Sequence, residues 1–337
     1  MAFLYKDRFD STFPSLSEDG SAGVLSENAL WLLEQRYFAR RFDPSSGTVR
    51  KESSFCEFAR RVSRIVAAAE TCYLDGSEAD LEWLRRLEAN IFSDIINRRF
   101  LFNSPCLFAA GAGMTVDPAL GPKIYCPPEE MTFDDYDLLH RSKTKSQQLF
   151  ACFVIDVPDS IDGIFDGVKD AAVISKYGGG VGGNFGWLRE RGSPISGGIG
   201  GQASGPVSFM ETWNTMGAVV VQGGRRRAAL MGMLFDDHPD IFDFIDAKVE
   251  EGRLPYFNIS VCVSDRLMEV SEGGEFGLIS RSDGKVIRTV NGADLWNKLC
   301  ESAWRRGDPG IFFIDRANDD NLLKLDDTWK IESTNPC

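Results

Sequence analysis

The chain has 337 residues, of which 43% are hydrophobic and 26% charged, and this composition is typical of a globular protein with one large or two ordinary domains. Its 37 basic and 50 acidic residues leave a net charge of −13, which disfavours nucleic acid as a partner and leaves any phosphate ligand to local arginines and backbone amides. No apolar run approaches the roughly 20 residues of a membrane-spanning helix, and the charged N-terminus differs from a signal peptide. We therefore expect a cytoplasmic protein that binds neither nucleic acid nor membrane.

Cysteines and histidines are too scattered in the sequence to indicate a metal site. The eight cysteines lack C-x-x-C spacing, and the only two histidines are His140 and His238. This usage favours free thiols in a reducing cytoplasm. We interpret the DDHPD sequence at residues 236–240 as a helix start and not as a metal site, because acidic residues are favoured near a helix N-terminus.

The first 100 residues predict a short leader followed by a helical domain. Residues 1–24 are polar and contain glycine and serine, so we expect a leader there. Ser26 is a candidate N-cap for a helix through residues 30–41, and residues 53–73 and 78–100 repeat apolar side chains at helical spacing. These patterns predict a small helical domain over residues 25–100.

From residue 101 the pattern changes to short apolar runs that alternate with helical stretches. The candidate strands are residues 149–157, 182–190, 228–235, 256–264 and 310–315. The candidate helices are residues 162–177, 238–251 and 292–306. Strands that alternate with helices predict an α/β architecture with a largely parallel sheet. A proline-rich and charged insertion at about 107–147 predicts a long surface loop with one short helix.

Glycine clusters dominate residues 176–240. The clusters lie at 178–183, 197–201 and 223–224, and three arginines follow the last of them. Because glycine lets a ligand approach the main chain closely, this stretch predicts a surface for phosphates and bases. Glycines 178, 180 and 183 satisfy G-x-G-x-x-G, but the segment before them is helical in pattern and no acidic residue follows about 20 positions on. We therefore exclude a Rossmann motif, and the P-loop pattern is also absent.

Several motifs resemble the large subunit of ribonucleotide reductase, and they occur in that family's order. They are KYGGGVGGNFGWLRERGSPISGG from residue 176, ASGPVSFMETWN from 203, QGGRRRAALM from 222, DDHPDIFDFIDAK from 236 and FNISVCVSD from 257, with NSP at 103–105, GDPGIFFIDRAN at 307–318 and STNPC at 333–337. The sequence around DHPDI is most similar to the adenosylcobalamin-dependent class. The resemblance implies a ten-stranded α/β barrel built of two five-stranded halves, with the first half in residues 101–337.

The resemblance also implies an enzyme that converts ribonucleotides to deoxyribonucleotides by thiyl-radical chemistry. In such enzymes a cysteine radical on a loop removes the 3′-hydrogen of the substrate ribose inside a pocket that excludes solvent. Asn335 and Cys337 match the asparagine and the radical cysteine of the family's N-x-C-x-E finger loop. Cys152 matches the cysteine that gives hydrogen to the 2′ carbon and then forms a disulfide. On its own, Cys152 would be interpreted as a small buried residue of a strand.

Two further groups of residues are implied as nucleotide contacts. The substrate group, with a hydroxyl for phosphate and an arginine for the base, is Ser104, Ala151, Gly180 and Arg226. The group for an allosteric deoxynucleotide effector is Asp159, Ser160, Arg189 and Gln222. From the residues alone, NSP is also typical of a simple turn, and Arg189 is either a phosphate ligand or a solvated surface charge.

The sequence reaches Cys337 before the finger-loop glutamate, the second redox cysteine and the second half of the barrel. We expect these from a C-terminal half of the reductase, either on another polypeptide or after removal of an intein that begins at Cys337. The cofactor would be adenosylcobalamin, bound mainly by that half. The expected partners are a ribonucleoside di- or triphosphate, a thioredoxin-type reductant and, in a homodimer, a second copy. The alternative is a non-catalytic module that binds a deoxynucleotide.

Overall fold

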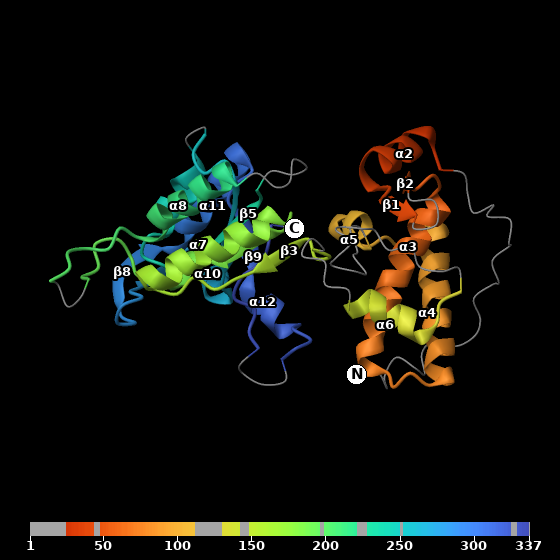
Figure 1. Ribbon diagram of the computed structural model, residues 1–337. Coiled ribbons are helices and arrows are strands. Elements are labelled where there is room, and N and C mark those ends of the chain that lie inside the picture. The colour runs from red at the N-terminus through yellow and green to blue at the C-terminus, as the bar shows by residue number, and fades with distance from the viewer. Residues whose placement is uncertain are drawn as a thin grey trace. The chain divides into compact units, whose positions relative to one another are not determined.

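The structure is a computed structural model, and it describes residues 25–43, 48–111, 130–141, 148–195, 199–220, 228–249, 252–324 and 329–336. The chain forms two compact units, residues 1–151 and 152–337, and Figure 1 labels many of their helices and strands. The first unit therefore ends later than the helical domain predicted over residues 25–100. The predicted leader lies outside the described residues, as does most of the predicted insertion.

The first unit is built on two long helices, α3 (Phe55–Ala68) and α4 (Glu78–Ile96). Both begin at serine N-caps, Ser54 and Ser77, whose hydroxyls accept backbone N–H groups, as expected for this residue type. The shorter helical elements of this unit are α2 (Glu27–Leu32), η1 (Leu33–Tyr37), η2 (Ala69–Tyr73), α5 (Ser104–Ala109) and α6 (Phe133–Arg141).

The first predicted helix is shorter than its sequence pattern. Ser26 caps α2 as expected, but the chain leaves the helix after Tyr37 and enters a hairpin of β1 (Arg40–Asp43) and β2 (Thr48–Lys51). Between the helix and the hairpin, the backbone N–H of Ala39 donates to the carboxylate of Glu52 at 2.8 Å. This contact with a residue beyond the hairpin holds the chain extended where the local pattern favoured a helix.

A buried ion pair lies against the core of the first unit. The Nε of Arg61 is 2.8 Å from Oε1 of Glu52, and the two side chains are only 4% and 1% exposed. The Arg61 guanidinium also donates to three backbone carbonyls, and it lies over the ring of Phe58, which is fully buried with Val62. Because the Arg61 guanidinium has the Glu52 carboxylate and three carbonyls as partners, its burial is tolerated. Loss of one partner would leave an unpaired buried charge and would destabilise the fold.

The second unit contains a five-stranded parallel sheet with the order β3-β4-β5-β6-β9. Its strands are β3 (Cys152–Val154), β4 (Gly180–Asn184), β5 (Leu230–Phe235), β6 (Phe257–Val263) and β9 (Gly310–Phe313). Helical segments connect the strands: α7 (Ile161–Lys176), η4 (Phe185–Trp187), α8 (Pro206–Val219), α9 (Ile241–Ile245), η6 (Asp246–Lys248), α10 (Asp265–Glu269), α11 (Gly292–Arg306) and α12 (Ile314–Asp319). A separate antiparallel hairpin is formed by β7 (Glu275–Ile279) and β8 (Val286–Asn291). The predicted α/β fold class with a parallel sheet is confirmed.

Buried aromatic side chains hold the helices against the sheet. Trp213 of α8 and Phe185 are fully buried and meet edge to face, with ring centroids 5.3 Å apart, and Phe185 also contacts Phe257 of β6. Such pairs add directional contacts to the burial of apolar area. None of the described helices is long and apolar enough to cross a membrane.

His238 has a structural role at the end of β5. Its ring is fully buried, Nε2 lies 2.9 Å from the carbonyl oxygen of Leu188, and Nδ1 accepts the backbone N–H of Asp240 at 3.0 Å. A carbonyl can only accept, so the proton is on Nε2 and the ring is neutral. Burial lowers the pKa of His238 to about 4.

This pKa predicts a stability that depends on pH. The unfolded histidine binds a proton below its ordinary pKa of 6.5, whereas the folded ring does so only near 4. The contribution of His238 is therefore complete above 6.5 and is lost as the pH falls from 6.5 towards 4, by up to about 1.4 kcal/mol per pH unit.

The measurement is urea unfolding at several pH values for the wild type and His238→Gln. Glutamine does not titrate, so the free energy of unfolding of the variant should fall less steeply below pH 6.5. Parallel pH profiles for the two proteins would contradict the assignment. The exposed His140 is present in both and cancels in the comparison.

Candidate active site and effector site

The second unit brings its C-terminal segment, residues 329–336, against one face of strand β4. Gly180, Gly182 and Asn184 lie at alternate positions of that strand and therefore share a face. A Cβ atom built on Gly182 would lie 1.9 Å from the carbonyl oxygen of Thr334 and 2.9 Å from the Cα of Asn335. Two backbones can approach this closely only where one of them has no side chain.

Asparagine and methionine side chains hold this segment in place. Asn184 donates its side-chain N–H to the carbonyl oxygen of Glu332 at 2.5 Å. Asn318, at the end of α12, both donates to the carbonyl of Ile331 at 2.9 Å and accepts its N–H at 2.8 Å. On β5, the sulfur of Met233 accepts the backbone N–H of Thr334 at 3.0 Å. The segment is thus fixed to β4 itself, to the neighbouring strand β5 and to the end of α12.

Cys152 meets the end of the same segment. Cys152 pairs with Gly180 in the parallel ladder between β3 and β4. The position of a Cβ on Gly180 would be 3.0 Å from the sulfur of Cys152 and 2.7 Å from the side chain of Pro336. Three of the predicted residues, Cys152, Gly180 and Asn335, therefore lie together, and Pro336 directly precedes Cys337 in the sequence.

The other predicted active-site residues belong to the first unit or lie outside the described residues. Ser104 and Ala151 belong to the first unit, where Ser104 begins α5 and its hydroxyl accepts a hydrogen bond from Tyr37 at 3.4 Å. Ala151 is bonded to Cys152 along the chain. Cys337, Arg226 and Gln222 lie outside the described residues, so their proposed roles stay predictions.

The predicted effector residues form a second group at the start of α7. Ser160 is the N-cap of this helix, and its hydroxyl accepts the N–H of Gly163 at 3.0 Å. The Arg189 Nε donates to Asp159 Oδ2 at 2.8 Å, and the Arg189 backbone N–H donates to Oδ1 at 3.2 Å. Both side chains are about one third exposed, at 33% for Arg189 and 32% for Asp159. These three residues were predicted to share one site, and the ion pair between Arg189 and Asp159 was not predicted.

Buried acids and thiols next to the sheet have shifted pKa values. Asp236 follows β5, and burial raises its pKa to about 6 although it accepts both the N–H and the hydroxyl of Ser264. Burial likewise raises the pKa of Cys262 on β6, so this thiol stays protonated and unreactive at neutral pH. Within the described part of the chain, no three His, Cys, Asp or Glu side chains are placed to hold a metal ion.

Both units match families of known proteins. Residues 150–337 match the family described as ribonucleotide reductase, barrel domain, and residues 24–115 match the ribonucleotide reductase all-alpha domain. The chain belongs to the ribonucleotide reductase family. The resemblance inferred from the sequence motifs is thereby confirmed, as is the order of a helical domain before a barrel domain.

Curated relatives of this reductase-family chain include vitamin B12-dependent enzymes. The chain is 41% identical over 201 residues to a vitamin B12-dependent ribonucleoside-diphosphate reductase of Thermoplasma acidophilum, covering 59% of this chain and 26% of that protein. It is 34% identical over 316 residues to the enzyme of the same name from Mycobacterium tuberculosis, covering 93% and 39%. A vitamin B12-dependent ribonucleotide reductase of Streptomyces avermitilis is 32% identical over 338 residues, covering 93% and 31%. The chain thus spans at most 39% of the length of these three relatives.

Residues that position the C-terminal segment were missed in the sequence analysis. Asn184, Met233 and Asn318 contact it directly, yet none was singled out as a site residue. The one local signal was an asparagine in a strand that is otherwise glycine and valine, because a buried polar side chain in such a strand needs a partner. The methionine gave no signal, since this residue type is common in cores.

Replacement of Gly182 by alanine tests the close approach of the two backbones. The added methyl group would overlap the Thr334 carbonyl, so we expect residues 329–336 to be displaced while the sheet persists. Overpacking of this kind costs about 1–3 kcal/mol, and amides of the segment should exchange hydrogen faster by a corresponding factor. Hydrogen exchange followed by mass spectrometry measures this.

The matched control is Gly217→Ala in α8. Its added methyl group would have neighbours no closer than 3.3 Å, none of them in the C-terminal segment, and alanine favours a helix over glycine by about 1 kcal/mol. This variant should leave exchange in residues 329–336 unchanged. Equal exchange in Gly182→Ala and the wild type would show that the segment does not depend on the missing side chain.

Proposed function

We propose that this chain is the N-terminal part of a ribonucleotide reductase large subunit, which reduces ribonucleotides once the complementary part of that subunit is supplied. One observation carries this proposal. The Cys152 sulfur and the side chain of Pro336, the residue before Cys337, both lie within 3.0 Å of the position that a Cβ atom on Gly180 would take. A radical cysteine and a hydrogen-donating cysteine must both reach one ribose. Family membership supports the reaction class.

The chemistry proposed for Cys152 is hydrogen donation coupled to disulfide formation. Replacement of the 2′-hydroxyl by hydrogen takes two electrons and two protons, which two thiols supply as they form a disulfide while the hydroxyl leaves as water. Cys152 would be one of these thiols, and the second would come from the complementary part of the subunit. A thioredoxin-type dithiol would then reduce the disulfide by exchange.

The residues next to Cys152 do not form a cradle for a cobalamin cofactor. The space in front of Gly180 and Gly182 is already filled by Pro336 and Thr334, which lie within 3 Å of the positions a Cβ would take. We therefore assign none of the described residues around Cys152 to the cofactor. The names of the relatives support adenosylcobalamin as the addition to test, with its contacts in the complementary part.

The decisive experiment is ribonucleotide reduction by this chain with the complementary part of the large subunit, adenosylcobalamin and a dithiol. Deoxyribonucleotide should appear only when both polypeptides are present. Cys152→Ser should lower the rate by at least about 100-fold, in the range of losing one proton-transferring group, because serine cannot give up a hydrogen atom or form a disulfide.

Cys300→Ser is the matched control for the thiol substitution. Cys300 lies exposed on α11, so its loss should leave the rate within about twofold of the wild type, as for a neutral surface substitution. A Cys152→Ser enzyme that retains full activity would overturn the role of Cys152. The absence of product with every component present would overturn the proposed activity itself.

We also propose that Asp159, Ser160 and Arg189 hold a deoxynucleotide effector. Support comes from their grouping at the N-terminus of the 16-residue helix α7, because free backbone N–H groups and the helix dipole favour an anion there. Arg189 offers guanidinium donors beyond the one used by Asp159. A carboxylate beside it is suited to accept a sugar hydroxyl.

Effector binding should weaken when Arg189 is replaced by alanine. Loss of a charge-assisted hydrogen bond of about 1.5–3 kcal/mol predicts a dissociation constant for a deoxynucleoside triphosphate that rises about tenfold or more, measured by titration calorimetry. Arg191→Ala is the control, since Arg191 is also exposed but pairs with Asp243 at 3.4 Å, outside the group. Equal weakening by both variants would indicate a general charge effect and would refute the site.

A further inference from the structure

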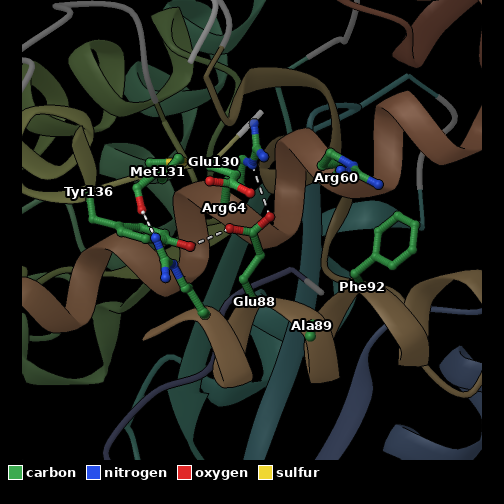
Figure 2. A pocket seen from close by; sticks show the side chains of 9 residues that line it. Arg60, Arg64, Glu88, Ala89, Phe92, Glu130, Met131 and Tyr136 are labelled. Carbon is green, nitrogen blue, oxygen red and sulfur yellow. Dashed lines mark hydrogen bonds and ion pairs between the residues drawn. The ribbon is translucent and has the colours of Figure 1, made fainter. Parts of the chain in front are cut away.

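A pocket of about 440 Å³ opens in the helical unit between α3, α4 and the start of α6. Figure 2 shows it with Arg60 and Arg64 from α3, Glu88 and Phe92 from α4, and Tyr136 from α6. This volume is within the range of small-molecule sites, about 300–1,000 Å³. None of these residues belongs to the proposed active or effector site.

A hydrogen-bonded network fixes one wall of the pocket. The Arg64 Nε lies 2.9 Å from Glu88 Oε1, and the Tyr136 hydroxyl donates to Glu88 Oε2 at 2.5 Å, as the dashed lines in Figure 2 show. Burial and the Glu88 carboxylate raise the pKa of Tyr136, so its phenol remains a donor. The Arg64 side chain is only 8% exposed, and its charge is balanced by Glu88. This wall is therefore rigid and neutral.

Two other guanidinium groups line the pocket and are accessible. Arg85 donates to the carbonyl oxygen of Met131 at 3.0 Å, and Arg60 lies over the ring of Phe92, 5.4 Å from its centroid. Both residues are exposed, and within the described residues neither forms an ion pair. Each contact orients a guanidinium and leaves most of its five donors available. Such a group is suited to a phosphate, which arginine binds with paired hydrogen bonds, and it can also lie against a planar base.

The rest of the lining suits a larger molecule than phosphate. Phe92, Ala89 and Met131 supply apolar surface, and the Glu130 carboxylate can accept hydrogen bonds from hydroxyl or amino groups. We propose that this pocket binds a nucleoside monophosphate, with the phosphate held by Arg85 and the planar base against Phe92 beside Arg60, about two helical turns along α4. Glu130 would accept from the sugar or the base. Such a ligand would connect α3, α4 and α6.

The experiment is hydrogen exchange of the whole chain with adenosine monophosphate and, separately, with inorganic phosphate at the same concentration. Peptides from α3 and α4 should exchange more slowly with the nucleotide and be unaffected by phosphate alone. The double variant Arg60→Ala/Arg85→Ala should lose this protection, with a dissociation constant at least about tenfold higher, as expected for lost charge-assisted contacts. Circular dichroism would verify that its helices are intact.

Three controls make the proposal falsifiable. Arg86→Ala removes an exposed arginine next to Arg85 that does not line the pocket, so it should keep the protection. Arg189→Ala should keep it too, which separates this pocket from the proposed effector site. Arg60→Lys/Arg85→Lys keeps both charges but loses the paired donors, and it should bind with intermediate affinity. Equal protection by inorganic phosphate, or unchanged binding by the double alanine variant, would overturn the proposal.

Discussion

The position of the C-terminal segment depends on the contact of two backbones across Gly182. Because this residue has no Cβ, the chain at Thr334 can lie directly on strand β4. The side chains on either side, Asn184 on the same strand and Met233 on the next, reach the segment only at this separation. A side chain at position 182 would lift the segment away and would separate Pro336 from Cys152. The geometry proposed for radical chemistry thus rests on the absence of one methyl group.

The close neighbour of Gly182 could not be predicted from the sequence. Clustered glycines correctly indicated that something approaches the main chain closely, and the sequence analysis took this to be phosphate and base. At Gly182 the neighbour is Thr334, which lies far along the chain. The identity of a long-range neighbour is set by how the chain folds back, and no local pattern contains it. By contrast, the helix starts at Ser54 and Ser77 could be predicted, because a cap and its helix are adjacent in sequence.

The burial of two arginines in α3 could not be predicted from the apolar spacing of this helix. In α3 the apolar spacing predicted the helix correctly, and periodicity alone would leave every arginine on the solvent side. Arg61 and Arg64 are instead buried, because Glu52 from beyond the hairpin and Glu88 from α4 supply partners. These carboxylates lie in other elements, so the burial follows from tertiary packing. It also leaves Arg60, the preceding residue of the same helix, as one of the exposed cations of the pocket.

Exposure separates the arginines that build the structure from those suited to bind a ligand. The Arg61 side chain is 4% exposed, and removal of a partner from such a buried pair costs about 3–5 kcal/mol, so Glu52 cannot be exchanged for a phosphate. Arg189 is 33% exposed, and an exposed pair contributes only about 0–1 kcal/mol. In the proposed effector site, the link of Arg189 to Asp159 could therefore open at little cost for a phosphate, and the carboxylate could then accept a hydroxyl of the same ligand. In a chain with a net charge of −13, such a pair would, under the proposed role, keep the arginine in place until a phosphate binds.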